Sequence, residues 1–309
     1  MIFMDFSKGV IFSAQTAVGI LGNFSLVYCY VFLSYTEHKL RSTDLILKHL
    51  MMANALVLLS TGVPQTMTAF RLKHLFNDFT CKLTLYIQRV GRSVSISIIC
   101  LLSVFQAIKI CPMNSTWKDL KVKATKYITF SIYLCWILYM VVNLIFPIYH
   151  SGKWNKNVTK RRDLEYCSTG RDKISDSLYT ALLVFPEVLF SVIIIWSSGS
   201  MTLILYRHKQ QVQHIHSAHL SSRLSPESRA TQNILALVCT FVSFYTLSSI
   251  LNACVAVSYN SSWWLANSNA LISVCFPTVS PFLMSRDSQV FRLCFHWVRN
   301  TKSPNIINV

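Results

Sequence analysis

Long stretches of this chain carry no charged residue, and this limits the folds open to it. Residues 9–36 contain no Asp, Glu, Lys, Arg or His. An α-helix rises about 1.5 Å per residue, so this stretch is long enough to cross the roughly 30 Å hydrocarbon core of a bilayer. It is about twice the length of a signal-peptide core and lacks a small-residue cleavage pattern. We therefore expect it to remain in the protein as a membrane helix.

Further stretches pass the same test. Residues 50–70 and 127–149 are uncharged, and residues 177–206 contain a single charged residue, Glu187. The uncharged tract 231–285 is long enough for two passes. With a less regular stretch in between, the predicted spans are 9–34, 45–70, 81–108, 127–149, 177–206, 230–258 and 264–285.

The composition agrees with this interpretation. Hydrophobic residues make up 52% of the chain and charged residues 13%, which is too apolar for a solvated globular domain of this size. The sequence predicts an all-α, multi-pass membrane protein. We expect residues 1–309 to form one domain, a seven-transmembrane helix bundle.

The orientation in the membrane follows from the loops. With the N-terminus outside, more Lys and Arg residues fall in inner loops than in outer loops, as the positive-inside rule favours. The same orientation places Cys81, Cys167 and the sequon at Asn157 on the outer, oxidising side. We expect a glycan on Asn157. The sequon at Asn114 would lie in an inner loop, and the one at Asn260 lies very close to the membrane.

The cysteines suggest one disulfide bond. Most of the others fall inside spans, where cysteine behaves as a small hydrophobic residue: Cys29, Cys100, Cys135, Cys239, Cys254 and Cys275. Cys81 and Cys167 lie in loops on the same side. A bond between them would attach the outer loop, residues 150–176, to the start of the third helix, where it could cover a cavity between helices.

A formal net charge of +17 raises the question of nucleic-acid binding. The basic residues are divided between the two sides of the membrane and form no continuous stripe with stacking aromatics, so no nucleic-acid partner is expected. Anionic membrane lipid explains the inner basic loops better. Residues 286–299 should form a short amphipathic helix after the seventh span, along the inner membrane surface. Cys294 in this helix is either palmitoylated or a packed free thiol.

The sequence offers little support for catalysis or metal binding. His214, His216 and His219 share one inner loop, but no cysteine or carboxylate lies close to them before Glu227. No nucleophile elbow, zinc-protease helix or phosphate-binding glycine loop is present. We expect no enzyme activity, no metal and no cofactor. A small-solute transporter is an alternative, although the chain has no internal repeat and seven spans do not divide evenly.

The irregular third span contains the candidate ligand-binding residues. Gln88, Arg89 and Arg92 lie one to two turns after Cys81, and the two arginines are spaced so that both can project toward nearly the same helix face. A charge inside a membrane span costs about 2.5–3.5 kcal/mol, which favours turning these groups toward water, a counter-ion or a ligand. Glu187 is the obvious partner within the membrane. A structural ion pair and direct ligand contact both remain open.

The order of local motifs resembles the rhodopsin-like G-protein-coupled receptors. Gly22-Asn23 and Asn54 occupy the places of that family's first-helix Gly-Asn and second-helix Asp. Where the family has Asp-Arg-Tyr, this chain has Phe105-Gln106-Ala107, and where it has Asn-Pro-x-x-Tyr, this chain has SPFLM at residues 280–284. The signature residues are thus repeatedly replaced.

These departures resemble the vomeronasal type-1 receptors, a pheromone-receptor family. The matching strings are DLILKHL at 44–50, GVPQTM at 62–67, CLLSVFQAI at 100–108, CFPTVSPFL at 275–283 and NVT at 157–159. The resemblance implies a plasma-membrane receptor that binds small, pheromone-like semiochemicals and activates a Gi/Go-type heterotrimeric G protein. A taste type-2-like receptor is the nearest alternative, but it should lack these strings and the cysteine pair.

The resemblance also implies which residues face the G protein. Phe105 and Gln106 stand where the family's Asp-Arg-Tyr motif ends the third helix. The basic loop that follows should meet the same partner. The G-protein-facing residues expected on this basis are Phe105, Gln106, Lys109, Lys121, Lys123 and Lys126.

Overall fold

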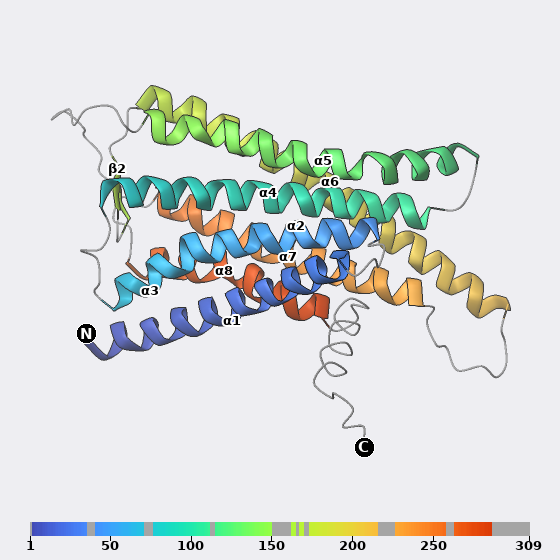
Figure 1. Cartoon of the computed structure of the whole chain (residues 1–309), viewed down its shortest axis with the longest axis horizontal. Coiled ribbons are helices and arrows are strands. Elements are labelled where there is room, and N and C mark those ends of the chain that lie inside the picture. The colour runs from blue at the N-terminus through green and yellow to red at the C-terminus, as the bar shows by residue number, and fades with distance from the viewer. Residues whose placement is uncertain are drawn as a thin grey trace, which may run out of the picture.

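The chain folds into an elongated bundle of seven membrane-length helices (Figure 1). The computed structural model describes residues 2–35, 41–70, 77–111, 115–149, 162–164, 167–169, 173–215, 226–257 and 263–285. The helices are α1 (Ile2–Tyr35), α2 (Ser42–Val57), α3 (Val63–Ala69), α4 (Asp78–Ile110), α5 (Ser115–Tyr149), α6 (Lys173–Ile215), α7 (Pro226–Val257) and α8 (Trp263–Ser285). The prediction of a seven-helix membrane bundle is confirmed.

Two short strands accompany the helices. β1 (Arg162–Leu164) and β2 (Cys167–Thr169) form an antiparallel hairpin in the connection between α5 and α6. The hairpin lies at the same end of the bundle as the N-terminus (Figure 1). The all-α prediction did not include this hairpin. Three expected features lie outside the described residues, namely the glycan site Asn157, the amphipathic helix 286–299 and Cys294 within it.

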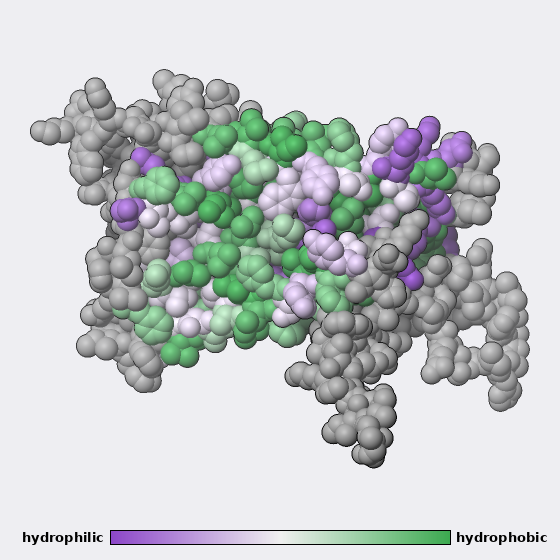
Figure 2. Space-filling model, in the orientation of Figure 1, coloured by the Kyte–Doolittle hydropathy of each residue, from purple (hydrophilic) through white to green (hydrophobic). Residues whose placement is uncertain are grey.

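The surface of the bundle is apolar over most of its length. Trp196 is 79% exposed, and Leu21, Phe130 and Ile195 are also largely exposed. Figure 2 shows a band of hydrophobic residues along the helices and hydrophilic residues gathered where α4 ends and α5 begins. An apolar surface of this extent would be a liability in water, whereas lipid tails cover it without cost. The exposed face is therefore the lipid-facing one.

The core is centred on α4, which packs against α2, α5 and α6. Every residue from Ser93 to Cys100 is buried, so α4 presents no lipid-facing side over these two turns. Ile96, Ile98 and Ile99 join Leu50 and Met51 of α2 in one hydrophobic cluster. A helix segment that is buried on every side forms the interior of a bundle. Side chains on the surrounding helices then determine what can reach this interior.

The second span changes its helical form part-way. Between α2 and α3, residues Leu58–Gly62 form a π-helical turn, η1. Pro64 begins the next turn and has no N–H to donate, which is a common cause of such local widening. A Cβ on Gly62 would collide with Oγ1 of Thr16, so only glycine allows α1 to approach this closely. The wide turn and the glycine together position Thr61, which is buried.

Buried polar groups connect four of the helices. Asn54 Nδ2 donates to Ser280 Oγ at 2.8 Å, and Ser95 Oγ donates to Asn54 Oδ1 at 3.1 Å. Asn23 Nδ2 donates to the Pro277 carbonyl oxygen at 2.8 Å, and this oxygen is available because Pro281 has no N–H to offer it. Hydrogen bonds between side chains in a membrane bundle are typically worth about 0.6–2 kcal/mol each. They hold α1, α2, α4 and α8 in one register.

Candidate functional site

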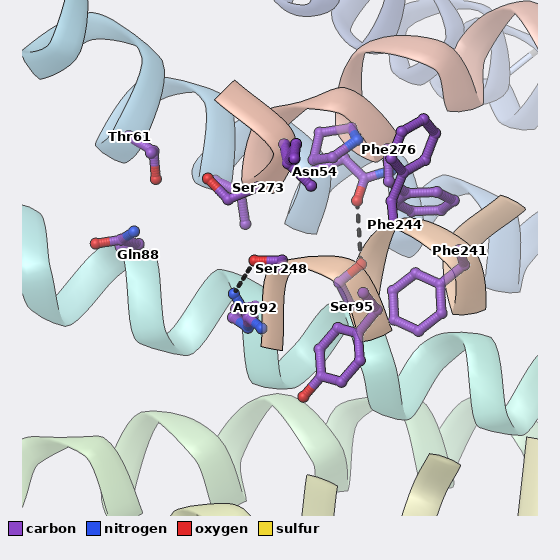
Figure 3. A pocket seen from close by; sticks show the side chains of 14 residues that line it. Asn54, Thr61, Gln88, Arg92, Ser95, Phe241, Phe244, Ser248, Ser273 and Phe276 are labelled. Carbon is purple, nitrogen blue, oxygen red and sulfur yellow. Dashed lines mark hydrogen bonds between the residues drawn. The ribbon is translucent and has the colours of Figure 1, made fainter. Parts of the chain in front are cut away.

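A small cavity lies inside the bundle between the second span, α4, α7 and α8 (Figure 3). Its volume is about 50 Å³. Its lining combines polar and aromatic side chains, which are Asn54, Val57, Thr61, Gln88, Arg92, Ser95, Phe241, Phe244, Tyr245, Ser248, Ile272, Ser273, Phe276 and Pro277. A mostly apolar cavity with a few convergent polar groups has the composition of a small-molecule site.

Arg92 is the charged group of this cavity. Its guanidinium donates to Ser248 Oγ at 3.4 Å and to Ser249 Oγ at 3.5 Å. Both distances exceed the usual range of about 2.7–3.2 Å, so these are weak hydrogen bonds. The guanidinium carbon also lies 4.7 Å from the ring centroid of Tyr245, a cation–π contact. The guanidinium has more donors than these contacts satisfy, and a stronger acceptor could replace the two serines.

Tyr245 links Arg92 to the acidic residue of α6. Both Arg92 and Glu187 act on the Tyr245 hydroxyl. Neither lies in standard hydrogen-bond geometry to it, and no other described residue does. Glu187 also acts on Tyr139 of α5. Among the described contacts there is no direct ion pair between Arg92 and Glu187. Both charged groups therefore lie near the phenol of Tyr245.

The opposite wall of the cavity is aromatic. Phe241 packs edge-on against Phe276, with 4.9 Å between ring centroids, and stacks on Tyr245 at 5.3 Å. Phe244 completes this wall on α7 (Figure 3). Aromatic pairs in these geometries contribute about 0.5–1.5 kcal/mol beyond the area they bury. They provide an apolar surface on this side of the cavity.

Two further polar groups border the cavity from the second span and α4. Thr61 is 3% exposed, and its Oγ1 has no hydrogen-bond partner among the described residues. Gln88 lies one turn before Arg92 on α4 and lines the same space. A buried hydroxyl without a partner costs free energy, and a ligand acceptor or a water would recover it. The polar groups converge from different helices on one region.

The predicted ligand-binding residues are distributed unevenly about this cavity. Gln88 and Arg92 line it, whereas Arg89 and Glu187 are not among the lining residues. Glu187 influences the site through Tyr245. Sequence reasoning missed Thr61, Tyr245 and the serines of α7 because the search followed charge. The available signal was the cluster of hydroxyl-bearing residues within otherwise apolar spans.

The first turns of α4 hold the cysteine of the predicted disulfide. Asn77 caps the helix, with its Oδ1 accepting from the Thr80 N–H at 2.8 Å, and this fixes Cys81 in the first turns. Cys81 is disulfide-bonded. Cys167 begins β2, but its side chain lies outside the described residues. The pairing of Cys81 with Cys167 therefore stays a prediction.

The other end of the bundle gathers the residues predicted to face a G protein. Phe105, Lys109 and Lys121 line a second cavity of about 220 Å³, and Lys123 and Lys126 are exposed. Lys121 Nζ donates to the carbonyl oxygen of Cys111 at 2.9 Å, which caps the end of α4. Gln106 is only 3% exposed. A partner would reach Gln106 only if the helix ends separated.

Within the described ranges, no group of three His, Cys, Asp or Glu side chains gathers as a metal site. The side chains of His214, His216 and His219 lie outside the residues that the structure describes.

These features define a class. A seven-helix membrane bundle with a polar and aromatic cavity enclosed by its helices is the architecture of a seven-transmembrane receptor. The sequence profile described as "Vomeronasal organ pheromone receptor family" matches residues 6–296. The chain belongs to the vomeronasal type-1 receptor family, whose members are chemosensory receptors of the G-protein-coupled type.

Individual relatives agree with this family assignment. The chain is 54% identical over 289 residues to vomeronasal type-1 receptor 4 of Pongo pygmaeus, covering 93% of this chain and 96% of the relative. It is 56% identical over 283 residues to vomeronasal type-1 receptor 2 of Homo sapiens, covering 91% and 72%. It is 29% identical over 280 residues to olfactory receptor class A-like protein 1 of Danio rerio, covering 90% and 88%. These relatives are named as receptors rather than as enzymes.

Proposed function

We propose that this protein is a plasma-membrane receptor for small semiochemicals that carry an acceptor or anionic group. The N-terminus faces outward, the ligand binds beside Arg92, and the opposite end activates a Gi/Go-type heterotrimeric G protein. The single observation that carries the ligand assignment is the state of Arg92. It is a charged group inside a membrane span that makes two long hydrogen bonds, to Ser248 and Ser249, and one cation–π contact.

A ligand acceptor at Arg92 would improve on the present contacts. Hydrogen bonds to a charged group contribute about 1.5–3 kcal/mol, more than bonds between neutral groups. The ligand's apolar body would then lie against Phe241, Phe244 and Phe276. Thr61 and Gln88 line the same space and could bind a second polar atom. The favoured ligand is thus amphipathic, with its polar group toward α4 and its apolar part toward α7 and α8.

The cavity must expand to accept such a ligand. Its volume is about 50 Å³, whereas ligand pockets usually measure about 300–1,000 Å³. The structure therefore corresponds to a contracted site. Because the two hydrogen bonds of Arg92 are long, moving its guanidinium toward a ligand acceptor gives up little hydrogen bonding. Binding that shifts Arg92 and Tyr245 would separate α4 from α7, and a change in their packing could be transmitted to the G-protein end.

The inner end supports the second half of the proposal. Lys123 and Lys126 of α5 are exposed there, and hydrophilic residues gather at the same end (Figure 2). Exposed cations favour encounter with a partner of complementary charge. We therefore assign this end to the G protein.

The test is expression of the receptor in cells with a promiscuous G protein and a calcium readout. The panel contains pairs of compounds that share one carbon skeleton. One member of each pair bears a carboxylate or ketone, and the other is the plain hydrocarbon. We expect dose-dependent responses to the acceptor-bearing members. Sensitivity of signalling through native G proteins to pertussis toxin tests the Gi/Go assignment. A panel in which hydrocarbons are as potent as their acceptor-bearing partners would overturn the role of Arg92.

A further inference from the structure

The second cavity lies at the end of the bundle opposite the N-terminus, between the start of α2, the end of α4 and the first turns of α5. Its volume is about 220 Å³. We propose that it binds a phosphate monoester on the headgroup of an anionic membrane lipid. This inference uses the proposed orientation, in which that end faces the cytoplasm and its anionic lipids, but it does not depend on the ligand assigned to the Arg92 cavity.

Three cations from three separate elements line this cavity. Arg41 directly precedes α2, Lys109 lies in the last turn of α4, and Lys121 belongs to α5. Asp44 is the acidic group beside them, and it accepts a hydrogen bond from the Arg41 backbone N–H at 3.2 Å. Among the described residues beside the cavity, three positive charges stand against one negative charge, which leaves a local excess. Like charges repel, and an anion in the cavity would relieve the repulsion.

The cavity also offers hydrogen-bond donors suited to phosphate oxygens. Ser42 and Thr43 line it from the first turn of α2, where backbone N–H groups have no partner within the helix. The positive end of the helix dipole points the same way. Lys121 uses one donor on the Cys111 carbonyl oxygen, and an ammonium group has others available. Charge, hydroxyl groups and the helix end thus converge on one space.

The surroundings favour a lipid headgroup over a free phosphate ion. Val122 follows the cavity residue Lys121 and is 65% exposed. Tyr127 and Phe130, further along α5, are also exposed. These apolar residues continue into the lipid-facing surface of the helix. A headgroup in the cavity would leave its acyl chains beside this surface, so that one molecule satisfies both the cationic and the apolar parts.

The experiment uses the full chain in nanodiscs of phosphatidylcholine, with or without a small fraction of phosphatidylinositol 4,5-bisphosphate, and native mass spectrometry to count retained lipids. We expect one bisphosphate lipid to be retained, and Arg41→Gln and Lys109→Gln each to reduce its retention about tenfold, as loss of a charged hydrogen bond predicts. Lys123→Gln and Lys126→Gln are matched controls, because they remove exposed cations outside the cavity. They should change retention less than about twofold, in keeping with the low energies of exposed charge pairs.

Three outcomes would overturn the proposal. Equal losses in the control variants would mean that the general positive field of this end attracts the lipid. Equal retention of phosphatidylserine would remove the preference for a phosphate monoester. Competition by soluble inositol trisphosphate at the same concentration as the lipid would indicate a site for free phosphates. Size-exclusion profiles of each variant identify any that misfold, and the double variant Arg41→Lys/Lys109→Arg, which keeps both charges, should then retain the lipid.

Discussion

The guanidinium of Arg92 on α4 lies over the ring of Tyr245 on α7, with its central carbon 4.7 Å from the ring centroid. A cation–π contact away from water is worth about 2 kcal/mol or more. It partly compensates the charge without removing it. The contact joins α4 to α7 and places the charge at the edge of the interior cavity.

Replacing Arg92 with Ala should lower the potency of acceptor-bearing ligands about tenfold or more, because it removes a charged hydrogen bond. The potency of plain hydrocarbon ligands should change little. Arg89→Ala is the matched control, since Arg89 is not among the cavity-lining residues. The measurement is a dose-response series on variants with equal surface expression. Equal losses for both ligand types would mean that Arg92 maintains the fold and does not contact the ligand.

Glu187→Gln should lower folding yield and thermal stability, because it removes the negative charge that acts on Tyr245, the residue over which Arg92 lies. If the effect runs through Arg92, the double variant Glu187→Gln/Arg92→Gln should lose less stability than the two single variants lose together. Coupled pairs of this kind show interaction energies of about 0.5–3 kcal/mol. Purely additive losses would show that the two charges act independently.

The predicted disulfide between Cys81 and Cys167 can be tested by serine substitution. Cys81→Ser and Cys167→Ser should each reduce surface expression, since a disulfide that closes a long loop contributes roughly 2–5 kcal/mol. The double variant should be no worse than either single variant, because each change breaks the same bond. Clearly larger losses in the double variant would show that Cys81 has a different partner. Cys239→Ser, at an exposed free cysteine, serves as the control.

Lys123→Ala/Lys126→Ala should reduce G-protein activation more than ligand binding. Both side chains are exposed at the end assigned to the G protein, away from the Arg92 cavity. Adding Lys121→Ala should also lower stability, because Lys121 caps α4 through the Cys111 carbonyl oxygen. The readouts are nucleotide exchange on purified G protein and ligand affinity. Unchanged exchange in the double variant would remove this pair from the partner surface.

Asn54→Leu should destabilise the bundle by about 1–3 kcal/mol, because it leaves the Ser95 and Ser280 hydroxyls without their shared partner. Asn54→Asp keeps the acceptor and should be tolerated better if the carboxyl group is protonated. Thermal unfolding in detergent measures both. A Leu variant as stable as the original would mean that packing alone holds α2, α4 and α8 together.

The seven spans could be predicted from the sequence because uncharged length marks a membrane helix independently of tertiary contacts. The same search identified Arg89 and Arg92 as charges within a span. Which of the two lines the cavity depends on the rotation of α4 against its neighbours, and hydropathy carries no information about rotation. The contributions of Tyr245, Ser248 and Thr61 were missed for the same reason, since neutral polar residues are recognisable as site residues only once the helices are packed.

The wide turn at Leu58–Gly62 accommodates one more residue than an α-helix would in the same length. Residues on its two sides are therefore rotated relative to each other by about one helical position. A receptor with a regular α-helix here would match this chain residue for residue before the turn and be offset by one residue after it. In that receptor, the residue aligned with Thr61 would lie one helical position away from the place of Thr61. Ligand selectivity could therefore change through the length of this turn alone, without substitution of any side chain that lines the cavity.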